Sequence, residues 1–212
     1  MKKKAGKKKS GRYTTKNTET TRKSIILAAL KAFSDMGFEG TSLREIAAAV
    51  GVTHGVIRHH FDGKEGLWRA VVDFAMAQYA DYLTPLLAQV NEMESLQLLK
   101  LCVRNFVYVS AQYPEIAKII MNDCKQEGPR LNYVYERMIP LLQAVEPIFL
   151  KVQAKGLLRK FNHEYFFVFL VSTGSAPFAV SALTSKVLGC NILAKERIFQ
   201  HADMVVSTLF GT

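Results

Sequence analysis

The sequence predicts an all-α protein of about nine helices. Apolar residues recur at helical spacing along almost the whole chain, and the alternation typical of strands is absent. Clusters of Gly, Pro and polar residues interrupt this pattern at intervals that suit helices. The length of 212 residues allows one large domain or two small ones, and the composition, 49% hydrophobic and 22% charged, is ordinary for a globular protein.

The first 23 residues hold most of the net charge of +10, because ten of the 28 Lys and Arg residues lie there beside a single acid, Glu19. Residues 1–18 have almost nothing apolar to bury, which predicts a disordered basic tail. Two interpretations stay open: a tail that only keeps the chain in solution, and an arm that binds a polyanion by releasing its counterions.

We expect a cytoplasmic protein. No apolar run is long enough to span a membrane, and the Lys-rich start is not followed by the apolar core of a secretory signal. Cys102, Cys124 and Cys190 are odd in number and widely spaced, which favours reduced thiols. For Cys102 and Cys124 we favour inert buried thiols over redox sensors, because no flanking basic residues would activate them.

The N-terminal part predicts three helices around a common core. The first runs from about residue 20 to 36, buries Ile26, Ala29 and Phe33 on one face, and ends at Gly37. The second covers about 42–49, and the third is capped by Thr53 and continues to about residue 60.

The two short helices and the turn between them form a helix-turn-helix motif at about 43–62. Ser42 and Glu45 predict a capping box at the start of the second helix, and Gly51 tolerates the left-handed turn that follows it. The seam between the helices is then formed by small or apolar residues: Ile46, Ala47, Val50, Val52 and Ile57.

The rest of the chain predicts a helical body. A fourth helix begins near Lys64 and reaches toward Leu83, where Pro85 interrupts it. Further helices are expected at about 94–112, 114–123, 129–155, 163–188 and 194–209. We therefore divide the chain into a tail (1–18), a small helical unit (19–79) and a larger helical domain (80–212).

The third helix carries three of the five histidines, in the stretch GVTHGVIRHHF. At roughly 100° per residue, His59 lies about 140° and His60 about 240° from His54, so the imidazoles do not converge. Metal-binding helices place their ligands three or four residues apart, and no Ser, Cys or Asp stands where it would make a nucleophile–base pair. We therefore expect no metal, no cofactor and no catalytic site.

The outward side of the third helix suits a different partner. His54 and Arg58 lie within about 40° of each other on the helix, and Ile57 points to the seam. Together with Thr53 and Gly55 they form an exposed front rich in hydrogen-bond donors. Such a front fits the major groove of DNA, where side chains meet phosphates and base edges.

The run ILAALKAFSDMGFEGTSLREIAAAVGVTHGVIRHHFDGKEGLWRAVV resembles the N-terminal domain of the TetR family of bacterial transcriptional regulators. The matching features fall in order without a gap: Ala28-Ala29, Phe33, Gly37-Phe38, Gly40-Thr41-Ser42, Ile46-Ala47, Gly51-Val52, Gly55, His59, Phe61, Lys64-Glu65 and Leu67. The resemblance implies an N-terminal DNA-binding domain followed by an effector-binding and dimerisation domain. It also favours the tail as an arm along the duplex.

The resemblance implies a role for each matching position. Thr41 and Ser42 would hold a phosphate, or only cap their helix, or do both. Lys64 would bind a flanking phosphate, or be a solvated surface lysine, and His60 would pack against the domain. The expected DNA-binding residues are Thr41, Ser42, Arg44, Thr53, His54, Gly55, Val56, Arg58, His59 and Lys64.

Arg58 departs from the family pattern, which has an aromatic residue, usually Tyr, at this position. The arginine keeps a phosphate contact with added charge, or it reaches a guanine edge through two hydrogen bonds. Both interpretations stay open.

The resemblance also implies a homodimer on a palindromic operator, a small-molecule effector, and most often repression. The interface is expected on the last two helices, where Ser172, Gly174, Ser175 and Ala176 allow close approach and Ile198, Met204, Val205, Leu209 and Phe210 add apolar surface; the alternative is that this surface is core within one subunit. Candidate effector-binding residues are Asn105, Phe106, Tyr108, Gln112, Met121, Tyr133, Phe149, Phe169 and Ser172, with Tyr113, Phe166 and Phe178 as further candidate lining. The alternative function is an architectural or chromosome-organising DNA-binding protein without an effector.

Overall fold

The computed structural model describes residues 15–159 and 161–211, and in this part of the chain it contains eleven helices and no strand. The all-α prediction is therefore confirmed. The helices are α1 (Thr15–Gly40), α2 (Leu43–Ala49), α3 (His54–Phe61), α4 (Lys64–Leu87), α5 (Ser95–Gln112), α6 (Pro114–Asp123), α7 (Pro129–Ala154), α8 (His163–Gly174), α9 (Ala176–Ala179), α10 (Ser181–Leu188) and α11 (Lys195–Phe210). Most of the tail, 1–14, lies outside the described residues.

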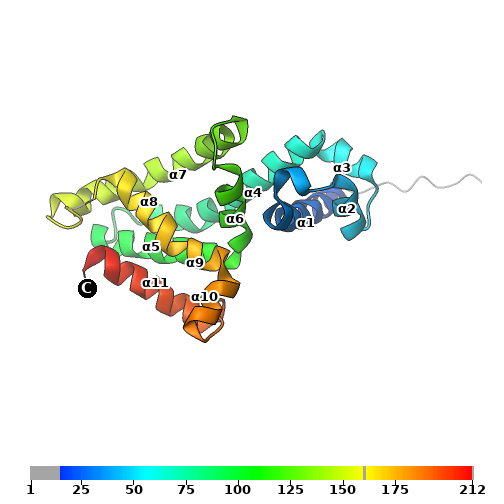
Figure 1. Cartoon of the computed structure of the whole chain (residues 1–212). Coiled ribbons are helices and arrows are strands. Elements are labelled where there is room, and N and C mark those ends of the chain that lie inside the picture. Colours follow the sequence, from blue (N-terminus) through cyan, green and yellow to red (C-terminus); the bar gives the residue numbers. More distant parts are fainter. Residues whose placement is uncertain (1–14, 160, 212) are drawn as a thin grey trace, which may run out of the picture.

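A small N-terminal unit consists of α1, α2, α3 and the start of α4, and α4 leads from it into the larger body (Figure 1). Ile26, Ala29 and Phe33 are buried in its core, as the spacing predicted, together with the fully buried Trp68 of α4. The predicted seam is confirmed as well: Ile46, Ala47 and Ile57 are buried, and Val50 and Val52 pack partly buried against them.

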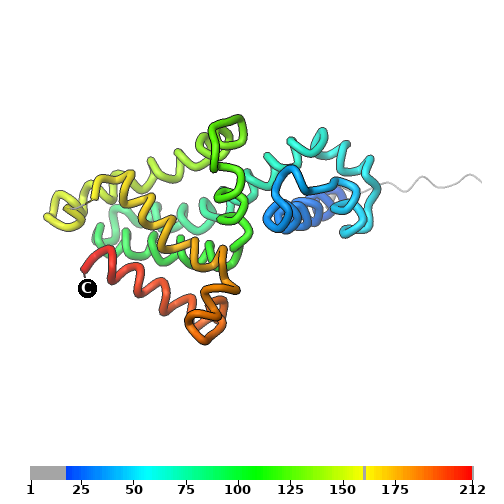
Figure 2. Tube along the Cα trace, in the orientation of Figure 1, coloured from blue at the N-terminus to red at the C-terminus, as the bar shows by residue number. Residues whose placement is uncertain are grey.

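The body packs its helices around a second core. α11 runs beside α5, as the tube in Figure 2 shows, and the C-terminal half of α7, with α8 and α9, completes this cluster. Burial of Phe149, Phe166 and Phe178 anchors it.

The two units are joined by more than the chain connection. The core of the N-terminal unit includes Ile116 and Ile119 of α6 and Val134 of α7, so the body contributes to it directly. The boundary predicted between residues 79 and 80 lies inside α4, which is continuous from Lys64 to Leu87. A displacement of α4 or α6 therefore changes the packing of both units.

The first and fourth helices are longer than predicted. α1 begins at Thr15, so residues 15–18, predicted as tail, form its first turn; neither Gly nor Pro occurs there to oppose a helix. Gly37 interrupts α1 as expected, with φ 69° and ψ 175°. α4 passes through Pro85 to Leu87 although the proline has no N–H to donate, because Leu86 and Leu87 pack against the body core in this conformation.

Two local predictions are wrong. Ser42 is the N-cap residue of α2, but its side chain makes no capping hydrogen bond, so the capping box is not formed. The helix predicted over 163–188 is divided into α8, α9 and α10, with an 85° bend between the α8–α9 segment and α10. Pro177 has no backbone N–H to continue α8, so α8 ends at Gly174 and the short α9 follows. Phe178 of α9 is buried, with its ring centroid 5.2 Å from that of His201.

Among the described residues, no single helix has both the length and the apolar character needed to cross a bilayer. The bent pair His163–Ala179 and Ser181–Leu188 meets these criteria only when its two arms are taken together.

Candidate nucleic-acid interface and ligand cavity

The third helix, α3, is anchored by one face and open on the other. Ile57 and Phe61 are buried, and the Arg22 guanidinium of α1 lies 5.2 Å from the Phe61 ring centroid. Arg58 and His59 are exposed on the opposite side. A short helix held through two large apolar side chains keeps its outward residues in fixed positions, as a recognition surface requires.

The turn before α3 has the geometry that Gly51 was predicted to allow. Its φ is 70°, in the left-handed region, and Val52 N–H donates to the Ala47 carbonyl at 3.0 Å. After α3, the start of α4 packs so closely that a Cβ added at Gly66 would lie 1.8 Å from the Phe61 carbonyl oxygen. Both glycines are required by the fold.

Gly55, in the first turn of α3, is different. It is exposed, and a Cβ added there would lie 3.7 Å from Thr53 Oγ1, an ordinary van der Waals distance. Nothing in the described part of the chain requires a glycine at this position. The outer surface of α3 is therefore bare at Gly55 in a way that favours close approach of a partner.

The histidines of α3 lie side by side and do not form a ligand set. The rings of His59 and His60 have centroids 5.6 Å apart, and His60 lies 6.0 Å from the Phe61 ring, partly buried as expected. Within residues 15–159 and 161–211, no group of three or more His, Cys, Asp or Glu residues is placed to hold a metal ion.

Thr41 is a structural residue, so the prediction that it binds phosphate is wrong. Its side chain is only 4% exposed, and its hydroxyl lies 2.7 Å from the Gly37 carbonyl and 3.2 Å from that of Ala32. These contacts satisfy carbonyl groups where α1 breaks. The sequence pointed to the correct helix junction but not to the direction of the side chain.

Lys64 matches neither of its two predicted interpretations fully. Its ammonium donates to the Glu39 carbonyl at 3.1 Å and lies 4.7 Å from the centroid of the Phe38 ring. Arg130 of α7 also stacks on Phe38, at 4.2 Å. An ammonium has three donors, so Lys64 can bind an anion while it keeps its contact with Glu39.

The remaining predicted DNA-binding residues lie at the surface around α2 and α3. Arg44 and Thr53 are exposed, whereas Ser42, His54 and Val56 are partly buried.

The N-terminal unit is joined to the body by ion pairs. Its acidic residues on the side toward the body are each paired with a basic residue of α6 or α7: Asp35 with Lys118 at 4.0 Å, Glu39 with Arg130 at 3.6 Å, and Asp73 with Arg137 at 2.9 Å. These exposed pairs contribute little stability individually. Their effect is to hold α1 and α4 beside α6 and α7.

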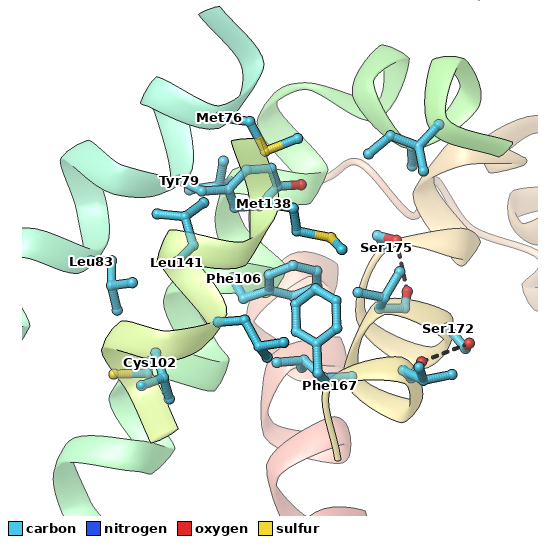
Figure 3. Close-up of a pocket in the computed structure, with 18 of the residues that line it drawn as sticks. Met76, Tyr79, Leu83, Cys102, Phe106, Met138, Leu141, Phe167, Ser172 and Ser175 are labelled. Atoms are coloured by element: carbon cyan, nitrogen blue, oxygen red, sulfur yellow. Dashed lines mark hydrogen bonds between the residues drawn. The ribbon is translucent and has the colours of Figure 1, made fainter. Parts of the chain in front are cut away.

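The body encloses a cavity of about 370 Å³ between α4, α5, α6, α7 and α8. Figure 3 shows the side chains of Phe106 of α5 and Phe167 of α8 near its centre, with Met76 and Tyr79 of α4 on one side. Its walls are mostly apolar, and the volume lies within the range of small-molecule sites.

The structure sorts the predicted effector residues into two groups. Asn105, Phe106, Met121 and Ser172 line the cavity, as does Phe166. The other predictions are wrong for this cavity: Tyr108, Gln112, Tyr113, Tyr133, Phe149, Phe169 and Phe178 do not line it.

Each misplaced aromatic residue has a packing partner instead. Tyr133 donates to Asp73 at 2.9 Å, Phe169 packs on Phe161, and Phe149 is completely buried in the body core. Tyr108 and Gln112 face a separate, shallower hollow beside α11. Aromatic character alone does not separate lining from core, since both are apolar.

Sequence reasoning missed most of α4 and α7 as cavity walls. Tyr79, Tyr82, Met138, Leu141 and Leu142 all face the cavity. The available signal was the long apolar character of these two helices, but their orientation depends on contacts between distant segments.

The environment of the two thiols in the cavity wall favours their neutral form. Burial raises the pKa of Cys102 to about 11, and burial followed by the nearby Asp123 carboxylate raises the pKa of Cys124. Both line the cavity as neutral thiols, which agrees with the inert interpretation.

The last helices present a large apolar surface to solvent. Seven residues of α8, α10 and α11 are more than half exposed: Tyr165, Val168, Leu183, Val187, Leu188, Phe199 and Met204. The detailed prediction for this surface needs correction, because Ile198, Val205 and Leu209 are buried against the subunit's own core and Phe210 is partly so. Gly174 and Ser175 are also internal, since a Cβ on Gly174 would lie 3.1 Å from the Phe106 ring.

Fold and site together define a helix-turn-helix protein whose small N-terminal unit is joined to a helical body with an internal cavity. Residues 25–71 match the model of the family described as bacterial regulatory proteins, tetR family. RutR of Escherichia coli strain K12, a transcriptional regulator of the helix-turn-helix type, is 33% identical over 111 residues, which cover 52% of this chain and 50% of RutR. TtgR of Pseudomonas putida, of the same type, is 32% identical over 117 residues, which cover 54% of this chain and 55% of TtgR.

Solved structures extend the likeness to the body. A crystal structure of AibR in complex with isovaleryl coenzyme A and operator DNA superposes with a TM-score of 0.70 at 21% identity, covering 90% of this chain and 98% of AibR. At this identity the match shows a shared fold. The N-terminal unit is therefore similar to that of the TetR family, and the chain spans about half the length of the curated relatives it matches.

Proposed function

We propose that this protein is a DNA-binding transcriptional regulator that responds to a small molecule in its cavity. The observation that carries the proposal is the arrangement of α3, whose buried Ile57 and Phe61 fix the helix while Arg58 and His59 face outward beside the bare backbone of Gly55. This is the arrangement that places side chains against base edges in a major groove.

The proposed contact set follows the structure. Arg58, His59 and Gly55 approach the groove, with His54, Val56 and Thr53 at the start of α3. Ser42, Arg44 and Lys64 contact the flanking backbone, whereas Thr41 is left out because it is buried. Phosphate contacts of this kind set the register, and the α3 residues select the sequence.

We propose a homodimer formed through α8, α10 and α11. One helix-turn-helix reads only a few base pairs, so a second copy is needed for a palindromic operator. The exposed apolar residues of these helices, such as Leu183, Val187 and Met204, support the choice of surface, because monomers seldom expose contiguous apolar patches of this kind.

The cavity is coupled to the DNA-binding unit through α4 and α6. α6 lines the cavity with Ile120 and Met121 and packs Ile116 into the N-terminal core. At its end, Asp123 accepts a 2.7 Å hydrogen bond from Trp68 of α4. A ligand that shifts α6 therefore changes the position of α4 and, through it, the separation of the two α3 helices in the dimer.

We propose repression in the cytoplasm with release from DNA on ligand binding. AibR, which shares the fold, was crystallised with both isovaleryl coenzyme A and operator DNA. A ligand shifts the equilibrium only if it binds the DNA-incompetent form more tightly. Nothing in this arrangement requires an enzymatic step.

The proposal is tested by selecting bound fragments from genomic DNA with the purified protein, followed by footprinting. We expect one or a few palindromes with half-sites about 34–36 Å apart, the spacing of consecutive major grooves. Uniform coating of DNA would support an architectural protein instead. A protein that stays monomeric and binds no duplex, even at low ionic strength, would exclude both functions.

A further inference from the structure

The polar side chains in the cavity wall are largely occupied by bonds within the protein. The Ser172 hydroxyl donates to the Val168 carbonyl at 2.8 Å, and that of Ser175 donates to the Val171 carbonyl at 2.7 Å (Figure 3). Both bonds run along α8 itself. These hydroxyls present only weak acceptor capacity to a ligand.

Two further polar groups of the wall are bonded to neighbouring helices. Tyr79 pairs with Ser110 Oγ at 3.1 Å, and because Ser110 already donates to the Phe106 carbonyl, Tyr79 is the donor. Burial raises the pKa of Tyr79, which keeps the phenol neutral. Asn105 Nδ2 donates to the Tyr82 carbonyl at 3.3 Å and so links α5 to α4.

Formal charge is absent from the described lining. It contains no Lys, Arg, Asp or Glu, and its two thiols are neutral. A charged group moved into such a site loses its hydration without gaining a counter-charge, which is strongly unfavourable. The cavity therefore disfavours a ligand whose charged group would be buried within it.

One polar group is different. His163, the first residue of α8, lines the cavity at 8% exposure, with its ring 5.3 Å from that of Phe149. No residue of the described chain forms a hydrogen bond with its ring nitrogens. Because these nitrogens are accessible and unbonded, a ligand hydroxyl or carbonyl in the cavity is a natural hydrogen-bond partner for them.

The volume sets the size of the ligand. A cavity of roughly 150 Å³ lined by apolar side chains binds benzene, so about 370 Å³ holds on the order of 15 non-hydrogen atoms. Tyr82, Met121 and Tyr135 line the cavity while 39–55% exposed, which places its opening beside them.

We propose that the cavity binds an uncharged lipophilic molecule of this size, with an apolar body among Phe106, Phe167 and Leu141 and one hydrogen-bonding group, a hydroxyl or carbonyl, at His163. The ligand proposal names the class of effector for the transcriptional regulator proposed above. Only the effect of the ligand on DNA binding rests on that proposed function. The binding itself is a property of the body.

The test compares three probes with the same chain and different head groups: dodecan-1-ol, dodecanoate and dodecyltrimethylammonium. Each is titrated into the full-length protein by calorimetry, below its own aggregation concentration. We expect saturable binding of the alcohol at least tenfold tighter than that of either ion. Tighter binding of dodecanoate or of the ammonium, or no saturable binding of the alcohol, would overturn the proposal.

Variants locate the bound alcohol. His163→Phe keeps a ring against Phe149 but removes the nitrogens, and we expect at least fivefold weaker binding because the ligand hydroxyl loses its partner. Leu141→Trp fills the cavity and should abolish binding. Thr173→Ala is the matched control on the same helix and should leave the affinity unchanged, because Thr173 does not line the cavity and its hydroxyl bonds to the Phe169 carbonyl at 2.7 Å. Equal affinities of the wild type and His163→Phe would disprove the anchoring role.

Operator binding without ligand is measured on the same preparations. If the alcohol binds and no operator is found, the proposed function fails and the ligand class stands. If an operator is found and the alcohol does not bind, the ligand class fails alone. His163→Phe that does not fold leaves the head-group series and Leu141→Trp as independent tests.

Discussion

The N-terminal unit and the body use their apolar side chains in opposite ways. In the N-terminal unit, Phe33, Ile57 and Trp68 are at most 1% exposed and hold α1 to α4 in one arrangement. The body leaves about 370 Å³ between five helices, so the side chains around it give up packing contacts. A surface that reads DNA benefits from rigidity, whereas a site that must respond to a ligand benefits from contacts that are made only on binding.

The connection between these regions is correspondingly narrow. Trp68 lies in the tightly packed core of the N-terminal unit. Its indole N–H donates to Asp123, the last residue of α6, which lines the cavity of the body. As the only tryptophan of the chain, Trp68 also reports on this junction by its fluorescence. Substitutions within the N-terminal unit should therefore change its stability and its operator affinity independently of each other. Substitutions in the body should change stability without touching the DNA-contacting residues.

The largest expected effect is on the fold of the N-terminal unit. Gly66→Ala places a Cβ 1.8 Å from a backbone oxygen that cannot move independently, so we expect about 3 kcal/mol of destabilisation, the upper range for overpacking. Urea unfolding followed by Trp68 fluorescence measures it. Gly55→Ala is the matched control: its stability should equal or slightly exceed that of the wild type, because alanine favours a helix more than glycine does, whereas its operator affinity should fall because the backbone can no longer come close. Loss of stability in Gly55→Ala would mean that the fold requires this glycine as well.

The next effect is on recognition alone. Arg58 is exposed on α3, so Arg58→Ala should leave the unfolding curve unchanged and weaken operator binding by about 1–3 kcal/mol. Arg58→Lys separates the two interpretations of this residue. A lysine restores a phosphate contact but not the paired hydrogen bonds to a guanine, so restored affinity would reject the base-reading role. Gel-shift titration at one fixed salt concentration is the measurement.

A smaller effect is expected at Thr41, where substitution should lower the stability and leave the operator affinity unchanged. Thr41→Val keeps the shape of the side chain and removes the hydroxyl that bonds to Gly37 and Ala32, at a cost of about 1 kcal/mol of stability. Operator affinity should not change under conditions where the variant is folded. A drop in affinity comparable to that of Arg58→Ala would return Thr41 to the DNA-binding residues.

The same contrast explains what the sequence could predict. The N-terminal unit is built from contacts between residues close in the chain, so the spacing of Ile46, Ala47 and Ile57 and the glycine at position 51 were sufficient to place α2, α3 and the turn. The directions of the side chains were harder to predict from the sequence. Thr41 and Lys64 both turn toward carbonyl groups of α1, which spacing along the sequence does not reveal.

The body shows where such reasoning ends. Helix positions were recovered, with α6 placed correctly at 114–123, because capping prolines and apolar periodicity are local signals. Which face of α4 or α7 borders the cavity depends on how five helices meet. Phe106 and Phe149 have the same side chain, and only the packing of α5 and α7 makes the first a cavity wall and the second core. The break between α8 and α9 is an exception, because Pro177 already signals it in the sequence.

The smallest effect concerns the start of α5, where the body depends on a charged cap. The Glu94 carboxylate accepts hydrogen bonds from Leu96 N at 2.7 Å and Gln97 N at 3.1 Å and pairs with Lys155 at the end of α7. The Lys155 hydrogen bond, followed by those backbone N–H groups, holds the pKa of Glu94 below its usual value of 4.5 in spite of partial desolvation.

Because the folded-state pKa of Glu94 is the lower one, its contribution to stability is present above about pH 4.5 and is lost as the pH falls through the folded value. Glu94→Gln keeps an acceptor for the helix N-terminus but removes the charge. The melting temperature of the variant should therefore lie slightly below that of the wild type at pH 7, and the difference should vanish as the pH approaches 3. A difference that is constant across this range would show that the charge of Glu94 contributes nothing and that only its shape matters. Lys155→Gln should reproduce the effect at neutral pH, since the pair acts as a unit that ties the start of α5 to the end of α7.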